Sequence, residues 1–245
     1  MENIIAVNKL HKSFGANKVL RGVDLNITTS GIIAVLGPNG SGKTTLIKSI
    51  LGMVLPNAGE IRVLGNNTKG EWKYKTDITY LPQIARFPEN LSVSELISMI
   101  KDLRGQQANT EPLIEKFGLE GFLNQKLVNL SGGTKQKVNL VLTFMYDTPI
   151  VILDEPTTGL DPVALLSLKK MIQEMKKQGK TILITSHIMQ FVEEVADDII
   201  FLLEGVIHFR GSVGSLKEKY QANNIEQSIA KMLIDSEQHV KQASN

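Results

Sequence analysis

An eight-residue segment, Gly37-Pro38-Asn39-Gly40-Ser41-Gly42-Lys43-Thr44, has the residue types and spacing of a phosphate-binding loop. Its glycines can adopt positive backbone dihedral angles, so successive N–H groups can point at one anion. Lys43 is placed to reach the β- and γ-phosphates of a nucleoside triphosphate, and the hydroxyl group of Thr44 is placed to hold Mg²⁺. This segment, the phosphate loop, predicts nucleoside triphosphate binding; a chance glycine-rich turn is the alternative.

A second chemical signal is an acidic pair at the end of an apolar run. Val151-Ile152-Leu153 is followed by Asp154 and Glu155. A parallel strand that ends in carboxylates places them at the sheet edge where open α/β folds bind ligands. We expect Asp154 to hold Mg²⁺ and Glu155 to polarise an attacking water molecule. A strand that simply ends in solvent is the alternative.

A third signal is Ser131-Gly132-Gly133, which lies between Leu130 and Thr134 and precedes an apolar helical pattern. A serine and two glycines at a helix start can form a second anion-binding site, because helix N-termini present unpaired N–H groups. An ordinary serine-capped helix is the alternative. The chain therefore has two helix starts suited to phosphate, in separate segments.

The elements that must position these residues follow from the hydrophobic pattern. Apolar runs predict buried strands at four places: 32–36, 78–81, 150–153 and 181–185. Alternation over 23–27, with a similar strand at 61–64, predicts an antiparallel β layer beside them. A helix is predicted over 45–51, directly after the phosphate loop. Strands separated by helical patterns favour an α/β core.

Residues from about 88 to 148 show helical patterns only, and we interpret them as a helical subdomain inserted into the core. Ser92-Val93-Ser94-Glu95 has the form of a capping box and predicts a helix start. Further helices are predicted over 111–117 and 134–146. A later helix is predicted to begin at Asp161-Pro162, with Asp161 as its cap.

The C-terminal part of the chain contains one more predicted motif. Residues 198–203 and 206–210 flank Glu204-Gly205 and predict a β-hairpin. Residues 1–220 are predicted to form one nucleotide-binding domain. Residues 221–245 are polar, and a tail or a short helix fits them equally well.

Composition limits the remaining possibilities. The 245 residues are 42% hydrophobic and 21% charged, which is typical of a globular protein. The net charge of +2 gives no reason to expect a nucleic-acid partner, and the absence of cysteine excludes disulfides and thiolate metal sites. No apolar run approaches the roughly 18 residues needed to span a bilayer. Any membrane role is therefore expected to depend on a partner.

The order of these motifs resembles that of the nucleotide-binding subunits of ATP-binding cassette (ABC) transporters, over residues 1 to about 215. The phosphate loop matches the Walker A motif of this family. Residues 130–134 match its signature, and 151–155 match its Walker B motif. The resemblance implies a P-loop NTPase fold with a RecA-like α/β core, an antiparallel β subdomain and an inserted α-helical subdomain.

Four single positions complete the resemblance. Phe14 is similar to the aromatic residue that stacks on adenine, and Gln83 to the Q-loop glutamine. Asp161, in Gly159-Leu160-Asp161, is similar to the D-loop aspartate, and His187 to the switch histidine. Outside this order each signal would be weak, because a phenylalanine near a strand often belongs to the core and a histidine after a strand is often a surface residue.

The resemblance implies Mg²⁺-dependent ATP hydrolysis, with residues in three roles. The implied catalytic residues are Lys43, Glu155 and His187, and the implied metal ligands are Thr44, Gln83 and Asp154. The implied nucleotide contacts are Phe14, Gly37, Pro38, Asn39, Gly40, Ser41, Gly42, Lys43, Thr44, Thr45, Gln83, Ser131, Gly132, Gly133 and Asp161.

The resemblance also implies partners. Two nucleotide-binding subunits, expected to be a homodimer, would meet head to tail, so that each ATP lies between Walker A of one and the signature of the other. Asp161 would join the two sites. A separate integral membrane permease would complete the transporter, with no nucleic acid involved. The chain would then lie peripherally on the cytoplasmic face of the inner (plasma) membrane.

Two positions depart from the family pattern: Thr134 stands where glutamine is common, and Lys137 where arginine is frequent. The compact length is similar to the export-type branch, and the motif surroundings resemble the ATPase subunit of the copper transporter that matures nitrous-oxide reductase. A soluble ABC ATPase acting in translation or DNA repair is the alternative class. Such proteins usually carry two cassettes or a long heptad coiled coil, and this sequence has neither.

Overall fold

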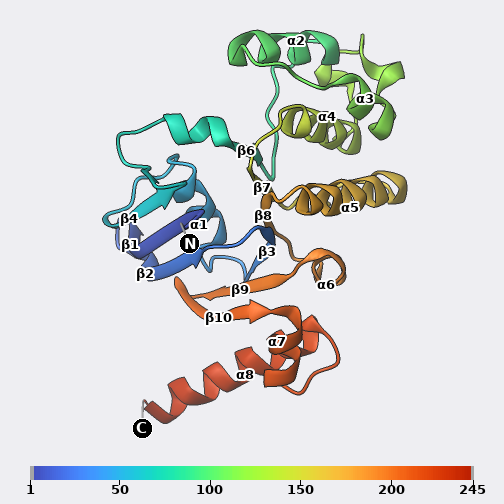
Figure 1. Cartoon of the computed structure of the whole chain (residues 1–245). Coiled ribbons are helices and arrows are strands. Elements are labelled where there is room, and N and C mark those ends of the chain that lie inside the picture. The colour runs from blue at the N-terminus through green and yellow to red at the C-terminus, as the bar shows by residue number, and fades with distance from the viewer. Residues whose placement is uncertain (1–2, 244–245) are drawn as a thin grey trace. The chain divides into compact units, whose positions relative to one another are not determined.

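The computed structural model describes residues 3–243. The chain divides into two compact units. Unit 1 consists of Met1–Lys69 with Thr185–Asn245, and unit 2 consists of Gly70–Ile184. Figure 1 shows the elements of both units in the colours of the chain. The predicted division at residue 220 stays a prediction.

Unit 1 contains an antiparallel sheet of strand order β2-β1-β4-β5. Its strands are β1 (Ile5–Phe14), β2 (Asn17–Ile27), β4 (Ala58–Val63) and β5 (Asn66–Asn67). The predicted antiparallel layer is confirmed, and the sequence pattern missed β1. The reason is local, because the β1–β2 register shifts between Val7 and Leu10, and Lys9 there has a φ of 43°. This bulge interrupts the alternation that identifies a strand.

A second set of strands in unit 1 has the order β10-β9-β3. Strand β3 (Gly31–Leu36) is buried throughout and runs parallel to β9 (Asp198–Leu203). Strand β10 (Val206–Ser212) pairs antiparallel with β9, which confirms the predicted hairpin. Both residues of its turn, Glu204 and Gly205, have positive φ angles, as a tight two-residue hairpin turn requires.

The described residues of unit 1 also form α-helices. They are α1 (Lys43–Ile50), α6 (Met189–Val195), α7 (Val213–Lys219) and α8 (Ile225–Ala243). Helix α1 follows the phosphate loop, as predicted. Helix α8 occupies the segment for which the sequence allowed a tail or a short helix, and it packs against α6 and α7 (Figure 1).

Unit 2 contains the strands β8-β7-β6 in that order, with β6 and β7 parallel. The strands are β6 (Ile78–Leu81), β7 (Ile150–Asp154) and β8 (Thr181–Thr185). The helices are α2 (Val93–Arg104), α3 (Glu111–Phe117), α4 (Gly132–Phe144) and α5 (Pro162–Lys177). Short 3₁₀ turns cover Lys73–Asp77, Glu120–Phe122 and Leu127–Asn129. Strands β7 and β8 are fully buried, as their apolar sequences predict.

The predicted helix caps of unit 2 are confirmed. Ser92 and Glu95 form a reciprocal capping box, in which the Ser92 N–H donates to Glu95 Oε2 over 2.7 Å and the Glu95 N–H donates to Ser92 Oγ over 3.2 Å. Asp161 caps α5, since its Oδ1 accepts the N–H of Ala164 over 2.9 Å. Helix α4 begins two residues earlier than the predicted 134–146, at Gly132, because Ser131 supplies the cap.

Candidate nucleotide site

The phosphate loop connects β3 to α1 in unit 1, and its shape depends on glycine. Gly37, Gly40 and Gly42 have φ angles of 149°, 80° and 106°. A Cβ atom at Gly37 would lie 2.0 Å from the carbonyl oxygen of Leu202. A Cβ atom at Gly42 would lie 2.9 Å from a Leu20 methyl carbon. A side chain at Gly37 would collide with backbone, and the φ of Gly42 is one that residues with a side chain rarely adopt, so the loop holds the open backbone conformation that an anion cradle needs.

Two side chains of the loop are suited to phosphate. In the part of the chain that the structure describes, Ser41 Oγ is buried without a hydrogen-bond partner. The ammonium group of Lys43 donates hydrogen bonds to the carbonyl oxygens of Gly37, over 2.8 Å, and Pro38, over 3.0 Å. A buried hydroxyl group without a partner is costly, and a phosphate oxygen would satisfy it. Together with the N-terminus of α1, these groups fit a nucleoside triphosphate.

Unit 1 also carries Phe14 and His187. Phe14 ends β1, and its side chain is 53% exposed, so the core alternative for this residue is wrong. The ammonium group of Lys12 lies 4.8 Å from the centroid of the Phe14 ring. His187 is exposed and is separated from the end of β8 by Ser186, whose Oγ accepts the N–H of Ile188 over 3.1 Å.

The acidic pair ends β7 in unit 2 and is almost fully buried. Asp154 is 3% exposed and Glu155 is 7% exposed, so the alternative of a solvated strand end is wrong. Tyr80 on β6 shares a side-chain hydrogen bond with Asp154. Burial, with smaller contributions from the charge and the hydrogen bond of Asp154, raises the pKa of Tyr80 to about 12. Glu155 has a φ of 52°, an unfavourable conformation for a residue with a side chain and one that concentrates at functional sites.

Gln83 is exposed two residues beyond β6. The backbone next to it is attached to α4, because the side-chain amide of Asn139 donates to the carbonyl oxygen of Pro82 over 3.2 Å. The start of the Gln83 loop is therefore hydrogen-bonded to α4 inside unit 2.

Ser131 caps α4, since its Oγ accepts the N–H of Thr134 over 3.2 Å. The alternative of a serine-capped helix therefore describes the local structure correctly. Ser131 is also exposed, so the N-terminus of α4 faces solvent. A Cβ atom added at Gly132 would meet no atom within 4 Å, whereas one at Gly133 would lie 2.6 Å from the carbonyl oxygen of Gly159. The signature glycines thus differ, because only Gly133 is needed for close packing inside unit 2.

The predicted site residues divide between the units as follows. Unit 1 holds Phe14, Gly37, Pro38, Asn39, Gly40, Ser41, Gly42, Lys43, Thr44, Thr45 and His187, and unit 2 holds Gln83, Ser131, Gly132, Gly133, Asp154, Glu155 and Asp161. The sequence analysis missed two residues that contact members of these sets: Tyr80, which bonds Asp154, and Lys137, which pairs with Asp161. For Lys137 a signal was present in the sequence, because this residue departs from the family pattern. For Tyr80 there was none.

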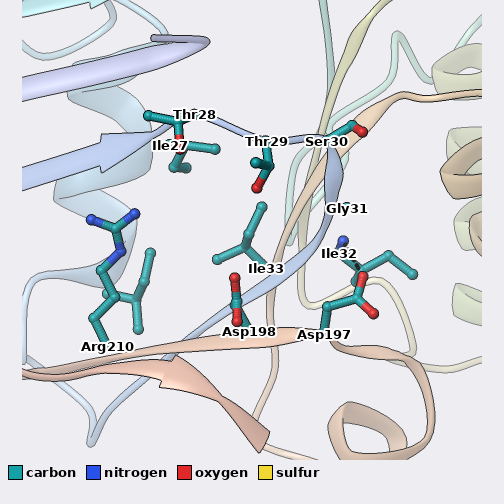
Figure 2. A pocket seen from close by; sticks show the side chains of 11 residues that line it. Ile27, Thr28, Thr29, Ser30, Gly31, Ile32, Ile33, Asp197, Asp198 and Arg210 are labelled. Atoms are coloured by element: carbon teal, nitrogen blue, oxygen red, sulfur yellow. Dashed lines mark hydrogen bonds between the residues drawn. The ribbon is translucent and has the colours of Figure 1, made fainter. Parts of the chain in front are cut away.

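Figure 2 shows a cavity in unit 1 that is distinct from the phosphate loop. It has a volume of about 40 Å³ and lies beside residues 28–31, at the amino end of β3, whereas the phosphate loop follows the carboxyl end. Asp197 lines the cavity and accepts the N–H of Ile32 over 3.0 Å. A space of this size holds a water molecule, not a nucleotide.

These features define an α/β protein with a phosphate-binding loop and a buried acidic strand end. The sequence matches the ABC transporter family over residues 20–158. The lantibiotic transport ATP-binding protein SrtF of Streptococcus pyogenes is 34% identical over 208 residues, which are 83% of this chain and 89% of SrtF. The ABC-type transporter ATP-binding protein EcsA of Bacillus subtilis (strain 168) is 30% identical over 224 residues, 89% of this chain and 91% of EcsA.

Solved structures agree with the sequence matches. A structure described as the ATP-binding subunit of an ABC transporter aligns with a TM-score of 0.87 and 28% identity, covering 94% of this chain and 99% of that one. The chain belongs to the ABC transporter family, and it is an ATP-binding and ATP-hydrolysing subunit of an ABC transporter. The alternative of an ABC ATPase in translation or DNA repair is not favoured, because the relatives are transporter subunits.

ATP-binding subunits of this family work with membrane permeases, and they are normally peripheral at the membrane. Between residues 3 and 243, no helix combines the length and the apolar character needed to cross a bilayer.

Proposed function

We propose that two copies of this chain form a homodimer that hydrolyses ATP at two equivalent sites and energises a separate membrane permease. Each site would combine the phosphate loop of one copy with Ser131 and Gly133 of the other, an arrangement that twofold symmetry makes equivalent. The observation that carries the proposal is the phosphate loop, in which Gly37 leaves no room for a Cβ atom, Gly42 has a positive φ and Ser41 offers a buried, unsatisfied hydroxyl group within the described residues.

The residues of unit 1 would bind the nucleotide. Phe14 would stack on the adenine ring, for which its exposed face at the end of β1 is suited. The loop amides, Ser41 and Lys43 would bind the phosphates, and Thr45 at the start of α1 would support them. His187 would contact the γ-phosphate and help to hold the attacking water molecule.

The residues of unit 2 would supply the acid–base chemistry. Glu155 would accept a proton from the attacking water molecule, and its place directly after β7 puts it beside the proposed Mg²⁺ ligand Asp154. Asp161 would contribute at the junction of the two sites. Phosphoryl transfer needs mainly positioning and charge stabilisation, which these groups can provide.

We further propose that Mg²⁺ is held by Thr44, Gln83 and Asp154. These residues offer hydroxyl, amide and carboxylate oxygens, the donors that Mg²⁺ prefers. Mg²⁺ in nucleotide sites is usually bound by one or two protein oxygens and completes its coordination with phosphate oxygens and water. Bound Mg²⁺ would neutralise charge that develops on the phosphate oxygens.

The chain would lie on the cytoplasmic face of the plasma membrane, attached to its permease and to no nucleic acid. Residues 83–92 would receive the permease, since this exposed segment follows β6 and its start is fixed by the bond from Asn139 to Pro82. The predicted similarity to the export-type, nitrous-oxide-reductase branch stays a prediction, because the cargo is recognised by the permease.

The test is ATP-dependent dimerisation of Glu155→Gln, measured by light scattering after size exclusion. We expect this variant to be a dimer with Mg-ATP and a monomer with ADP, because it binds ATP without hydrolysing it. Glu155→Gln combined with Lys43→Ala is the matched control and should stay monomeric. A Glu155→Gln variant that hydrolyses ATP at the parental rate, or never pairs, would contradict the proposal.

The transport role has its own test. The chain should co-purify from detergent extracts with a protein of several membrane spans. Recovery with ribosomes or DNA instead would contradict the proposed partner.

A further inference from the structure

The aromatic ring of Phe14, at the end of β1, has a positive charge beside one of its faces. The ammonium group of Lys12 lies over the ring, 4.8 Å from its centroid, which is within the range of a cation–π interaction. Phe14 is nevertheless 53% exposed. Because so much of this residue remains open to solvent, there is room for a second group to pack on the ring.

Lys12 is held in this place by a second contact. Its ammonium group donates a hydrogen bond to the carbonyl oxygen of Leu55 over 2.7 Å. A lysine side chain that extends into solvent samples many rotamers, whereas one with a hydrogen-bond acceptor and a ring as partners keeps its charge in one place. The charge beside Phe14 is therefore a feature of the fold of unit 1.

The segment that carries Leu55 is attached to β1 on both sides of Lys12. The backbone N–H of Asn57 donates to the carbonyl oxygen of His11 over 2.8 Å, and Asn57 Oδ1 accepts the N–H of Ser13 over 2.7 Å. This segment follows the C-terminal end of α1, whereas the phosphate loop precedes the N-terminal end of the same helix. Lys12 is therefore anchored near the end of α1 that is remote from the phosphate loop.

A cation on one face of an aromatic ring changes what the other face can bind. Both faces of a ring carry partial negative charge, so two rings that stack face to face repel each other electrostatically. A cation on the far face attracts electron density and reduces this repulsion. Lys12 also restricts the motion of the Phe14 ring, so less conformational entropy is lost when a flat group stacks on it.

We propose that Lys12 is a positioning residue that orients the Phe14 ring and strengthens the stacking of a purine base on its opposite face. The inference rests on the proposed function, in which Phe14 binds the adenine ring of ATP. Lys12 contributes to the affinity for the base and not to the affinity for the phosphates. Its contribution is the same before and during hydrolysis, because the base does not take part in the reaction.

The experiment compares the binding of ATP and of inorganic tripolyphosphate to the full chain by isothermal titration calorimetry. Lys12→Met removes the charge and keeps a long side chain. Its affinity for ATP should fall about two- to fivefold, as expected for one cation–π contact at an exposed site. Its affinity for tripolyphosphate should equal that of the parent, because this ligand has no base.

Two further variants serve as controls. Lys12→Arg should restore the affinity for ATP, since a guanidinium group also interacts with the face of a ring. Lys18→Met removes one positive charge at an exposed position of β2, in the same β1–β2 pair, and should bind both ligands as the parent does. The comparison separates the contact with Phe14 from a general attraction of the anionic ligand.

A double-mutant cycle identifies the ring as the group through which Lys12 acts. Phe14→Ala should weaken ATP binding, and the addition of Lys12→Met should cause no further loss. In steady-state hydrolysis, Lys12→Met should raise KM by the factor seen in binding and leave kcat unchanged. An equal loss of affinity for ATP and tripolyphosphate, a further loss in the double variant, or an unchanged affinity of Lys12→Met for ATP would overturn the inference.

The failure of this inference is distinguishable from the failure of the proposed function. If Phe14→Ala weakens ATP binding and Lys12→Met does not, only the role of Lys12 is wrong. If Phe14→Ala binds ATP as the parent does, the proposed adenine contact is wrong, and the inference fails with it. The dimerisation of Glu155→Gln tests the shared ATP sites independently of both residues.

Discussion

The hydroxyl group of Tyr80 and the carboxylate of Asp154 are joined by a hydrogen bond between β6 and β7. The two strands are parallel, and Tyr80 is paired in register with Ile152, two residues before Asp154. Because Asp154 is almost fully buried, the phenol takes the place of solvent as a partner of the carboxylate. Tyr80 therefore stabilises a buried charge that the proposed metal site needs.

Replacement of Tyr80 tests this relationship. Tyr80→Phe should lower the free energy of unfolding by about 1.5–3 kcal/mol, since it removes a hydrogen bond to a charged group. Tyr146→Phe is the control, because the Tyr146 hydroxyl group bonds the neutral carbonyl oxygen of Ile100 and should cost about 1 kcal/mol. Urea unfolding measures both. If Tyr80→Phe lowers the free energy of unfolding no more than the control does, the bond to Asp154 is no stronger than a hydrogen bond to a neutral acceptor.

The side chain of Lys43 provides a test of the phosphate loop. Lys43→Ala should weaken ATP binding about ten- to a hundredfold, because a charge-assisted contact to phosphate is lost. Lys48→Ala, in the last turn of the same helix, should leave the affinity at the parental value. Isothermal titration calorimetry gives both constants. Equal affinities for the parent and Lys43→Ala would be incompatible with the phosphate-binding role.

Much of the fold was predictable because its signals are local. The glycine spacing of the phosphate loop, the capping box at Ser92 and the Asp161-Pro162 helix start are each contained within a few residues, and each is confirmed as local structure. Strand β1 was missed because its bulge at Lys9 breaks the alternation. The bonds of Tyr80 and Lys137 were missed because their partners are distant in sequence, and no local pattern encodes them. The roles of the site residues stay predictions.

The two signature glycines should respond in opposite ways to alanine. Gly133→Ala should lower the free energy of unfolding by about 1–3 kcal/mol, because its methyl group would collide with the carbonyl oxygen of Gly159. Gly132→Ala meets no neighbour and should be neutral or stabilising by up to about 1 kcal/mol, as alanine favours helix. Thermal unfolding distinguishes them. Equal melting temperatures would mean that the backbone of Gly159 moves away without cost.

The positive φ of Glu155 leads to a prediction about strain. Both Glu155→Gly and Glu155→Ala should abolish hydrolysis, because both remove the proposed base. Glycine tolerates this conformation and alanine does not, so Glu155→Gly should be the more stable by about 1 kcal/mol. Denaturant unfolding of the two variants measures the difference. A more stable alanine variant would show that the backbone at 155 relaxes when the carboxylate is removed.

The ion pair of Lys137 and Asp161 should make stability depend on pH in the acid range. Lys137 and the Ala164 amide lower the folded-state pKa of Asp161 below its ordinary value of 3.8, so the unfolded chain binds this proton more readily. The resulting stability is fully present above the unfolded pKa and is lost as the pH falls through the lower folded pKa. The difference in unfolding free energy between the parent and Asp161→Asn should therefore be constant near neutral pH and shrink below about pH 4. Asp102→Asn, at an exposed position on α2, is the control for the same type of substitution. If the difference in unfolding free energy between the parent and Asp161→Asn stays the same down to the pH of acid unfolding, the ion pair does not form in solution.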